Sequence, residues 1–187
     1  MNEQELVKLS KRLSRVLRHR PETIGITLDA QGWVDVPDLL KALSRTGTRV
    51  TPEQLAEVVE RNDKKRFALE DGRIRARQGH SLDVDLGLPE TEPPPVLYHG
   101  TVRRHLDSIR AHGLLRGNRH HVHLSSDTAT ARTVGSRRGL PVVLTVHAGR
   151  MAADGAAFHV TDNGVWLTEY VPVAYLADAT GTPLPPV

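Results

Sequence analysis

Four prolines between Leu88 and Val96, in the run LPETEPPPV, divide this chain near its middle. Such a run favours an extended polyproline II conformation and cannot continue a helix or the interior of a sheet. Each side holds about 90 residues, enough for a domain to bury a core of its own. We therefore expect two domains, residues 1–90 and 91–187, joined by a proline-rich hinge.

Residues 1–90 begin with an amphipathic helix. Apolar side chains recur at helical spacing along ELVKLSKRLSRVLR. They belong to Leu6, Leu9, Leu13, Val16 and Leu17. The helix should end before Pro21, because proline disfavours helical geometry in the residue that precedes it.

The rest of this half predicts a strand, two helices and a hairpin. GWVDV is a strand pattern, and PDLLKALSRTG has proline at its start and glycine at its end, as helices often do. Thr51 and Gln54 form a capping box for a third helix. RFALE and RIRAR flank an Asp-Gly pair, a strong hairpin signal. This order is that of a winged helix, so we expect residues 1–90 to bind nucleic acid.

Residues 91–187 are richer in predicted strands. PVLYHGT, HHVHL and PVVLTVHAG have strand patterns, and AFHVTDNGVWLT predicts a hairpin across its Asn-Gly pair. RRHLDSIRAHG has helical periodicity that stops at Gly113. The fold class is therefore α+β, with an antiparallel sheet in the second domain.

The composition excludes several kinds of site and location. The chain contains no cysteine, which rules out disulfides, thiolate zinc ligands and cysteine nucleophiles. No segment approaches the roughly 20 apolar residues of a membrane helix, and the N-terminal residues lack the apolar core of a secretory signal. We expect a cytoplasmic protein without membrane contact, and a monomer.

Positive charge is unevenly distributed, although the net charge is only +3. No acidic residue lies between Glu5 and Glu22, where the cations are Lys8, Lys11, Arg12, Arg15, Arg18 and Arg20. From Pro93 onward every fixed cation is an arginine, whose planar guanidinium suits phosphate oxygens. High genomic GC content would also favour arginine over lysine.

Arg18 and His19 stand at the end of the first predicted helix, and Arg66 opens the first strand of the hairpin. The residues alone leave two interpretations open. Cations at a helix C-terminus offset the helix dipole, and Arg66 fits an exposed cation of the wing. The alternative is that the three side chains form part of a site.

The stretches LYHGT and RHHVHLSSD carry polar side chains at strand ends. The alternation of His121 and His123 would suit a metal pair, but no carboxylate or cysteine nearby completes a ligand set. Ser125 and Ser126 fit hydroxyl donors or a helix N-cap, and Thr101 fits a cap of the next helix. Gly100 would let a ligand approach the backbone closely.

Five segments in order resemble the Tpt1/KptA family of NAD-dependent RNA 2'-phosphotransferases. They are LSKRLSRVLRHRP, DKKRFAL, IRARQGHS, LYHGT and RHHVHLSSD, and they span most of the chain. The resemblance implies a winged-helix RNA-binding domain over residues 1–90 and an ADP-ribosyltransferase-like NAD-binding domain over residues 91–187. It also implies NAD as co-substrate and an RNA with an internal 2'-phosphate, such as a spliced tRNA, as partner.

The implied reaction has two steps. The RNA 2'-phosphate attacks C1'' of the NAD ribose, nicotinamide leaves, and an ADP-ribosylated RNA 2'-phosphate forms. The ribose 2''-hydroxyl then attacks the phosphorus, which gives 2'-hydroxyl RNA and ADP-ribose 1'',2''-cyclic phosphate. An anionic phosphate nucleophile needs alignment rather than a strong base, and arginines stabilise the phosphoryl charge of the second step.

The family's motifs assign roles to particular residues. The catalytic set falls on Arg18, His19, Arg66 and Arg119. The NAD contacts fall on His99, Gly100, Thr101, His123, Ser125 and Ser126, and no metal is expected. Gln78, Gly79, His80 and Ser81 match a motif that would touch the substrate or connect the domains. The glutamate that often orients the ribose in this fold has no assigned counterpart, and Glu169 is not given that role.

Two other functions remain open at this point. An ADP-ribosyltransferase that modifies terminal phosphates of nucleic acid, or protein, would need only the first step. A winged-helix regulator with a ligand-sensing domain would explain the basic first helix but not the motifs of the second half.

Overall fold

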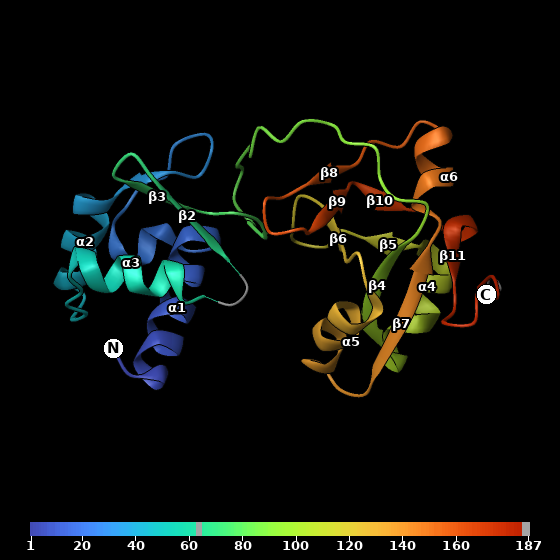
Figure 1. Cartoon of the computed structure of the whole chain (residues 1–187), viewed down its shortest axis with the longest axis horizontal. Helices are drawn as coiled ribbons and strands as arrows, with labels where there is room; N and C mark the ends of the chain where they lie inside the picture. The colour runs from blue at the N-terminus through green and yellow to red at the C-terminus, as the bar shows by residue number, and fades with distance from the viewer. Residues whose placement is uncertain (63–64, 185–187) are drawn as a thin grey trace. The chain divides into compact units, whose positions relative to one another are not determined.

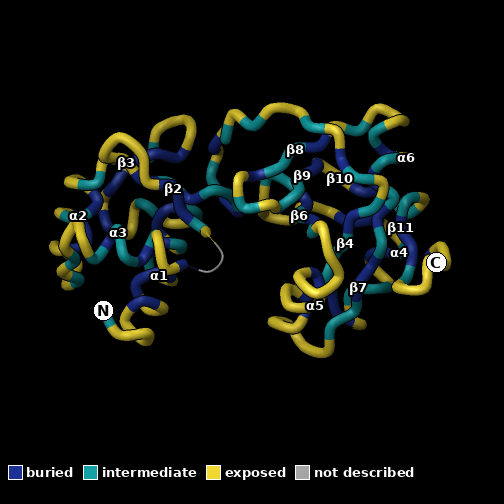
Figure 2. Tube along the Cα trace, viewed as in Figure 1, coloured by how far each residue is buried: buried dark blue, intermediate teal, exposed yellow. Residues whose placement is uncertain are grey.

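The structure, a computed structural model, describes residues 1–62 and 65–184 of the chain (Figure 1). The chain divides into two compact units, Met1–Gly87 and Leu88–Val187, called unit 1 and unit 2 below. Each unit has its own cluster of buried apolar side chains, which Figure 2 shows as dark blue segments inside the units. No helix among the described residues combines the length and the apolar character needed to cross a membrane.

Unit 1 combines helices with a small antiparallel sheet. The helical elements are α1 (Glu3–Arg18), the 3-10 turn η1 (Pro21–Ile24), α2 (Val36–Arg45) and α3 (Pro52–Glu60). The strands are β1 (Val34–Asp35), β2 (Phe67–Glu70) and β3 (Arg73–Ala76), in the order β1-β3-β2. The predicted order of elements is confirmed, and the mixed α+β class with antiparallel sheets holds for the described chain.

The first helix buries the predicted face. Leu13 and Leu17 are completely buried, and Leu6, Leu9 and Val16 are nearly so. Each buried leucine contributes about 1.5–3 kcal/mol of transfer free energy, which fixes the rotation of α1 about its axis. The helix ends at Arg18, with His19 as its C-cap, before Pro21 starts η1. The last turn therefore places Arg18 and His19 at a defined helix end.

Strands β2 and β3 form a tight hairpin. Asp71 and Gly72 both have positive φ, 48° and 73°, as a type I′ two-residue turn requires. The register pairs Phe67 with Ala76 and Glu70 with Arg73. The capping box of Thr51 and Gln54 at the start of α3 is also present. Local sequence signals therefore determine both features.

Unit 2 is built from short strands in three small antiparallel sheets. The orders are β11-β7-β4, β6-β9-β8 and β10-β5. The longest strands, β4 (Leu97–Val102) and β7 (Pro141–Val146), pair along their whole length. The other strands are β5 (Leu114–Leu115), β6 (Val122–Leu124), β8 (His159–Val160), β9 (Trp166–Thr168), β10 (Tyr170–Val171) and β11 (Leu176–Ala177).

The helices of unit 2 lie between these strands in the chain. They are η2 (Arg103–His105), α4 (Leu106–His112), α5 (Thr128–Ser136), α6 (Ala148–Ala153) and η3 (Val173–Tyr175). The predicted stop of α4 at Gly113 is confirmed. The predicted hairpin of β8 and β9 is also present, with Asn163 and Gly164 inside a turn that Thr161 closes by accepting from the Gly164 amide.

Helix α5 packs unusually close to β4. A Cβ on Gly100 would lie 1.7 Å from the Ala131 carbonyl oxygen, and one on Gly135 would lie 2.8 Å from the Thr101 carbonyl oxygen. Ala131 and Gly135 are the buried residues of α5, and its other residues are exposed. We call the close approach of Gly100 and Gly135 across this interface the glycine contact. It requires that neither residue has a side chain.

The proline-rich segment, which was expected to be a hinge, is attached to unit 2. The Thr91 amide donates to the Phe158 carbonyl at 2.8 Å, and the Gly149 amide donates to the Pro95 carbonyl at 3.1 Å. A Cβ on Gly149 would lie only 3.0 Å from Pro95. The segment takes part through the amide of Thr91 and the carbonyl of Pro95, since proline lacks an N–H but keeps its carbonyl. It therefore has a fixed path over α6 and β8.

Candidate functional site

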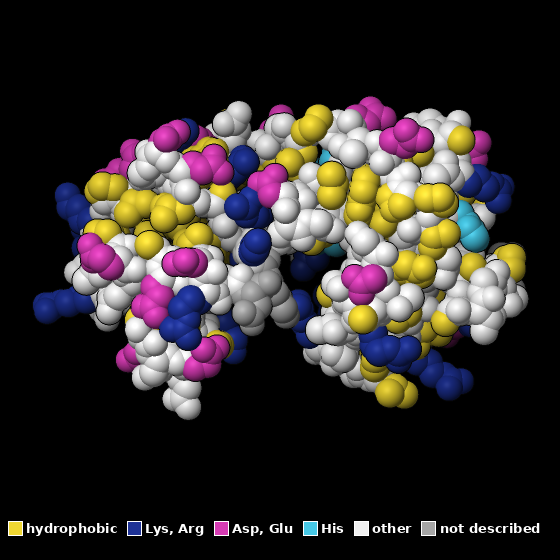
Figure 3. Space-filling view, in the orientation of Figure 1, with side chains coloured by type: hydrophobic (Ala, Val, Ile, Leu, Met, Phe, Trp, Pro, Cys, Tyr) yellow, Lys and Arg dark blue, Asp and Glu magenta, His cyan; other side chains and the backbone are white. Residues whose placement is uncertain are grey.

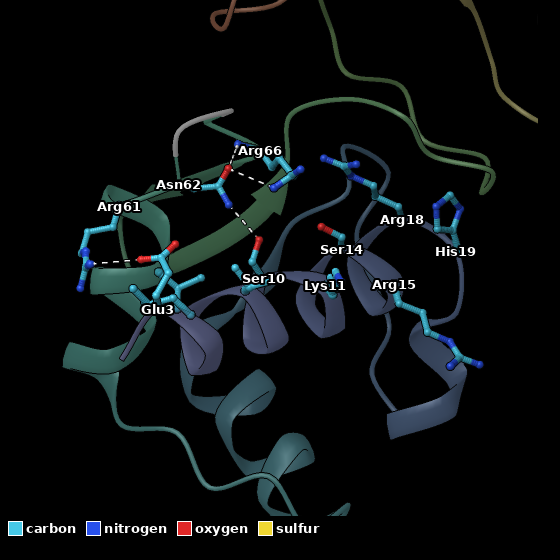
Figure 4. A pocket seen from close by; sticks show the side chains of 13 residues that line it. Glu3, Ser10, Lys11, Ser14, Arg15, Arg18, His19, Arg61, Asn62 and Arg66 are labelled. Carbon is cyan, nitrogen blue, oxygen red and sulfur yellow. Dashed lines mark hydrogen bonds and ion pairs between the residues drawn. The ribbon is translucent and has the colours of Figure 1, made fainter. Parts of the chain in front are cut away.

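Arg18, His19 and Arg66 line one groove of unit 1, with a volume of about 500 Å³ (Figure 4). Arg18 and His19 come from the end of α1, and Arg66 comes from the residue before β2. Figure 4 shows the Arg18 and Arg66 side chains converging. The structure thus brings together residues that are 48 positions apart in sequence, although helix-end and wing positions alone did not require it.

Ser81 fixes the end of α1 and the His19 ring. Its backbone amide donates to the Arg18 carbonyl at 2.9 Å. Its hydroxyl oxygen lies 3.0 Å from Nδ1 of His19, within hydrogen-bond distance. The segment after β3, expected either to touch the substrate or to connect the domains, therefore also supports the helix end that carries two of the predicted site residues.

Asn62 positions Arg66. Its side-chain oxygen accepts from the Arg66 backbone amide at 3.4 Å and from Nη1 of Arg66 at 3.5 Å. Its side-chain nitrogen donates to the hydroxyl of Ser10 on α1 at 2.8 Å. Asn62 and Ser10 are both buried, and a buried polar pair is costly to break. Sequence reasoning missed Asn62, since one asparagine after a helix has no distinctive signal.

The groove is electropositive where the three residues meet. Its cations are Lys11, Arg15, Arg18, Arg61 and Arg66. Glu3 is the acidic residue of the described lining, and it pairs with Arg61 at 3.5 Å at the other end. Arginines grouped beside a histidine suit an anionic ligand.

His99 and His123 form the centre of a second polar cluster, in unit 2. Nδ1 of His99, on β4, donates to the His123 carbonyl of β6 at 3.1 Å. Burial and the nearby charges of Arg138 and Arg119 lower the pKa of His99. The ring is therefore neutral near pH 7, and the hydrogen bond assigns the proton to Nδ1, which leaves Nε2 as an acceptor.

Arg119 contacts His123 of this cluster. Its Nη1 donates to Nδ1 of His123 at 3.2 Å. Desolvation and repulsion from Arg138 and Arg137 lower the pKa of Arg119, which still stays charged at neutral pH. Arg137 and Arg138 follow α5 and were not predicted as site residues. Their gathering depends on α5 packing against β4, a tertiary contact that the sequence does not display.

Four of the predicted NAD residues have structural roles that differ from the local expectation. Gly100 is occupied on its Cβ side by α5, so its missing side chain serves helix packing, and its role as an NAD contact stays a prediction. Thr101 is buried within β4 and caps no helix, since α4 has His105 as its N-cap.

The two serines are likewise not caps. Ser125 exchanges backbone hydrogen bonds with Tyr98, which joins the end of β6 to β4. Ser126 is exposed. Asp127 caps α5 instead, because its carboxylate accepts from the Thr130 amide at 2.7 Å. The Ser125 hydroxyl remains a prediction as an NAD contact, as does that of Ser126.

The alternation of His121 and His123 around buried Val122 is present. The His121 ring packs edge-on against His159 with a centroid distance of 5.9 Å, while His123 accepts from Arg119. The described residues contain no group of three histidine, aspartate or glutamate side chains arranged to hold a metal ion.

Comparison with known proteins places the whole site in one family. Residues 4–170, which include every predicted site residue, match the family described as RNA 2'-phosphotransferase, Tpt1 / KptA family. The chain belongs to this family.

Relatives in the Tpt1/KptA family are similar over nearly their full length. The probable RNA 2'-phosphotransferase of Streptomyces coelicolor is 57% identical over 176 residues, which cover 94% of this chain and 97% of that protein. The protein of the same name from Agrobacterium fabrum is 58% identical over 169 residues, or 89% and 91% of the two chains. A transferase with an RNA substrate is therefore the activity class of this family.

Proposed function

We propose that this protein removes an internal 2'-phosphate from RNA by transferring it to NAD. The observation that carries the proposal is the convergence of Arg18, His19 and Arg66 on one groove. Membership of the Tpt1/KptA family supports it. In this proposal unit 1 is a winged-helix RNA-binding domain and unit 2 is an ADP-ribosyltransferase-like domain.

The groove of unit 1 suits a phosphate monoester on RNA. Such a group carries up to two negative charges and three free oxygens, and arginine guanidinium groups match these oxygens in pairs. Arg18 and Arg66 would hold the oxygens from two sides. With Asn62 fixing Arg66 and the α1 backbone fixing Arg18, little reorganisation is needed when the phosphate binds.

In the first step, a 2'-phosphate oxygen forms a bond to C1'' of the NAD ribose as the bond to nicotinamide breaks. The phosphate is already anionic, so the role of Arg18 and Arg66 is to align it rather than to activate it. No proton has to be removed, and the step needs no strong general base.

The second step requires more of the side chains. The ribose 2''-hydroxyl attacks phosphorus, and the bond from phosphorus to the RNA 2'-oxygen breaks. The charge on the phosphoryl oxygens redistributes, and Arg66 and Arg119 stabilise it. His19 protonates the departing RNA 2'-oxygen, with its ring oriented by the Ser81 hydroxyl.

The cluster of unit 2 fits NAD chemically. Nε2 of neutral His99 is an acceptor for a ribose hydroxyl. The cations gathered around it, Arg119, Arg137 and Arg138, suit the anionic pyrophosphate. NAD would supply the ribose carbon that receives the phosphate, while these side chains bind and orient it.

The test is incubation of the full chain with NAD and an RNA that carries one internal 2'-phosphate. The expected products are 2'-hydroxyl RNA, ADP-ribose 1'',2''-cyclic phosphate and nicotinamide. Phosphate release without NAD would refute the role of NAD, and no release at all would refute the function. An ADP-ribosylated product that persists without cyclic phosphate would instead indicate an ADP-ribosyltransferase.

Single-turnover kinetics separate the two steps. Arg66→Ala and Arg119→Ala should form the ADP-ribosylated RNA and then convert it at least about 100-fold more slowly than the wild type. If both variants kept wild-type rates in the second step, the assignment of these arginines would be wrong.

A further inference from the structure

The groove of unit 1 extends well beyond the place where Arg18, His19 and Arg66 meet. It follows α1 back towards its N-terminus, where Lys11, Ser14 and Arg15 also line it (Figure 4). From Arg18 to Lys11 the helix rises about 10 Å. This is more space than one phosphate group fills, so the 2'-phosphate leaves part of the groove for another portion of the substrate.

The cations of α1 separate into two sets. Arg12 is held within unit 1, since its Nη2 donates to the Thr46 hydroxyl at 2.6 Å and to the Thr46 carbonyl at 3.3 Å. Lys8 lines a different depression together with Arg12. The cations of the basic first helix are therefore divided between two depressions, and the set with Lys11 and Arg15 lines the groove that leads to Arg18.

Lys11 and Arg15 are available for an external partner. Both residues are exposed, and within residues 1–62 and 65–184 neither side chain makes a hydrogen bond or an ion pair. Figure 3 shows acidic side chains scattered among the cations of unit 1 on the face in view. In the groove, however, the acidic residue of the described lining is Glu3, which pairs with Arg61. The charge available to a partner therefore lies at Lys11 and Arg15.

The lining indicates which part of a nucleic acid would bind here. Besides its cations, this stretch offers the hydroxyl of Ser14 and the aliphatic side chain of Val7. The described lining between Lys11 and Arg15 has no aromatic ring on which a base could stack, and the one histidine of the described lining, His19, lies at the end where the 2'-phosphate is proposed to bind. Cations and hydroxyls without stacking rings bind the phosphodiester backbone and do not read the bases.

We propose that Lys11, Ser14 and Arg15 form a subsite for the phosphodiester backbone of nucleotides that flank the 2'-phosphorylated nucleotide. The subsite has space for about two nucleotides of single strand. It lies on one side of the 2'-phosphate, since the groove runs from Arg18 in one direction along α1. This inference rests on the proposed function, because it takes the 2'-phosphate to lie at Arg18, His19 and Arg66.

The test is a set of 2'-phosphorylated RNAs that carry zero to four additional nucleotides on the 5' side or on the 3' side. For each RNA, kcat/KM for 2'-phosphate removal is measured with NAD at saturation. In the wild type we expect kcat/KM to rise with length on one side only, by about tenfold in total, and to level off after about two nucleotides. Changing the base sequence of the extension should not alter the gain.

Three single substitutions of exposed cations locate the effect. Lys11→Ala and Arg15→Ala should each remove most of the gain from length and lower the salt dependence of binding by about one counterion. Lys8→Ala removes the same charge from a residue that lines the other depression, and it should keep the wild-type length profile. Circular dichroism checks that each variant is folded, and Arg15→Gln provides a second variant that keeps the length of the side chain.

The outcomes separate this inference from the function on which it rests. Failure of the wild type to process even the longest RNA would refute the proposed function. Processing at a rate independent of length, or with equal gains on both sides, would overturn the subsite alone. A length gain that survives in Lys11→Ala and Arg15→Ala, or that is lost equally in Lys8→Ala, would also overturn it.

Discussion

Replacing Gly100 by alanine should disrupt unit 2 without any contact to a ligand. The added Cβ would lie 1.7 Å from the Ala131 carbonyl oxygen, 2.7 Å from the Ala131 carbonyl carbon and 2.9 Å from the Gly135 nitrogen. Ordinary contacts begin near 3.4 Å. All three atoms are backbone, so no side chain can rotate away. Helix α5 would have to move from β4 by about 1.5 Å.

The expected cost follows from that displacement. Overpacking at a site that cannot relax costs about 3 kcal/mol, and separation of α5 from β4 also removes dispersion contacts between them. For a unit of this size, about 3 kcal/mol corresponds to a decrease in melting temperature of about 15 °C. Unit 1 has a separate buried core, so its stability should not change.

Hydrogen exchange followed by mass spectrometry reports on the two units separately. In Gly100→Ala the amides of β4, β7 and α5 should lose protection, while those of α1 and α3 keep it. Gly117→Ala is the control. Gly117 has φ of 60°, and an added Cβ there would have nothing within 4 Å. This substitution therefore introduces backbone strain alone, which costs about 1 kcal/mol. Wild-type protection in Gly100→Ala, combined with a raised KM for NAD, would refute the packing argument and show that Gly100 is needed for ligand approach.

Two further predictions concern side chains that position site residues, and a third concerns the pH dependence of the stability of unit 2. Asn62→Ala should slow the second chemical step about tenfold, because Arg66 loses its hydrogen bonds to Asn62. Ser10→Ala should lower the free energy of unfolding by about 1–3 kcal/mol but keep the wild-type rate of the second step. Equal second-step rates in the two variants would contradict a positioning role for Asn62. Ser81→Ala should slow the second step a few-fold and leave the first step unchanged, because the His19 ring loses the hydroxyl that orients it, and an unchanged second-step rate would argue against this. Unit 2 should lose stability relative to unit 1 as the pH falls below about 6.5, because His99 takes up a proton in the unfolded chain before it does so in the fold. His99→Gln should reduce that acid sensitivity in part, since His121 has a pKa lowered by burial too, and an unaltered pH dependence of denaturation would show that His99 does not contribute.

Features encoded by a few neighbouring residues could be predicted from the sequence. The end of α1 before Pro21, the capping box of α3 and the Asp71-Gly72 turn each depend on local backbone preferences. The buried leucines of α1 follow from helical periodicity. The grouping of Arg18, His19 and Arg66 was expected only through resemblance to a family, because no local signal relates a helix end to a wing strand.

Features that depend on tertiary packing could not be predicted in this way. Gly100 was interpreted as a point of ligand approach, whereas the space beside it is filled by α5, 31 residues later at Ala131. The serines before α5 looked like caps, but Asp127 competes better because its carboxylate reaches the Thr130 amide. Asn62 and Arg138 were missed, since their significance depends entirely on which side chains the fold places beside them.

The glycine contact has a consequence for ligand geometry. Strand β4 carries His99, and α5 leads directly into Arg137 and Arg138. Because backbone meets backbone between these two elements, their separation cannot vary with side-chain rotamers, and the strand and the helix move as one body. The spacing between His99 and these arginines is thereby set by two absent side chains. In the proposed function, this close packing would set the distance between the ribose and the pyrophosphate groups that the cluster can bind at once.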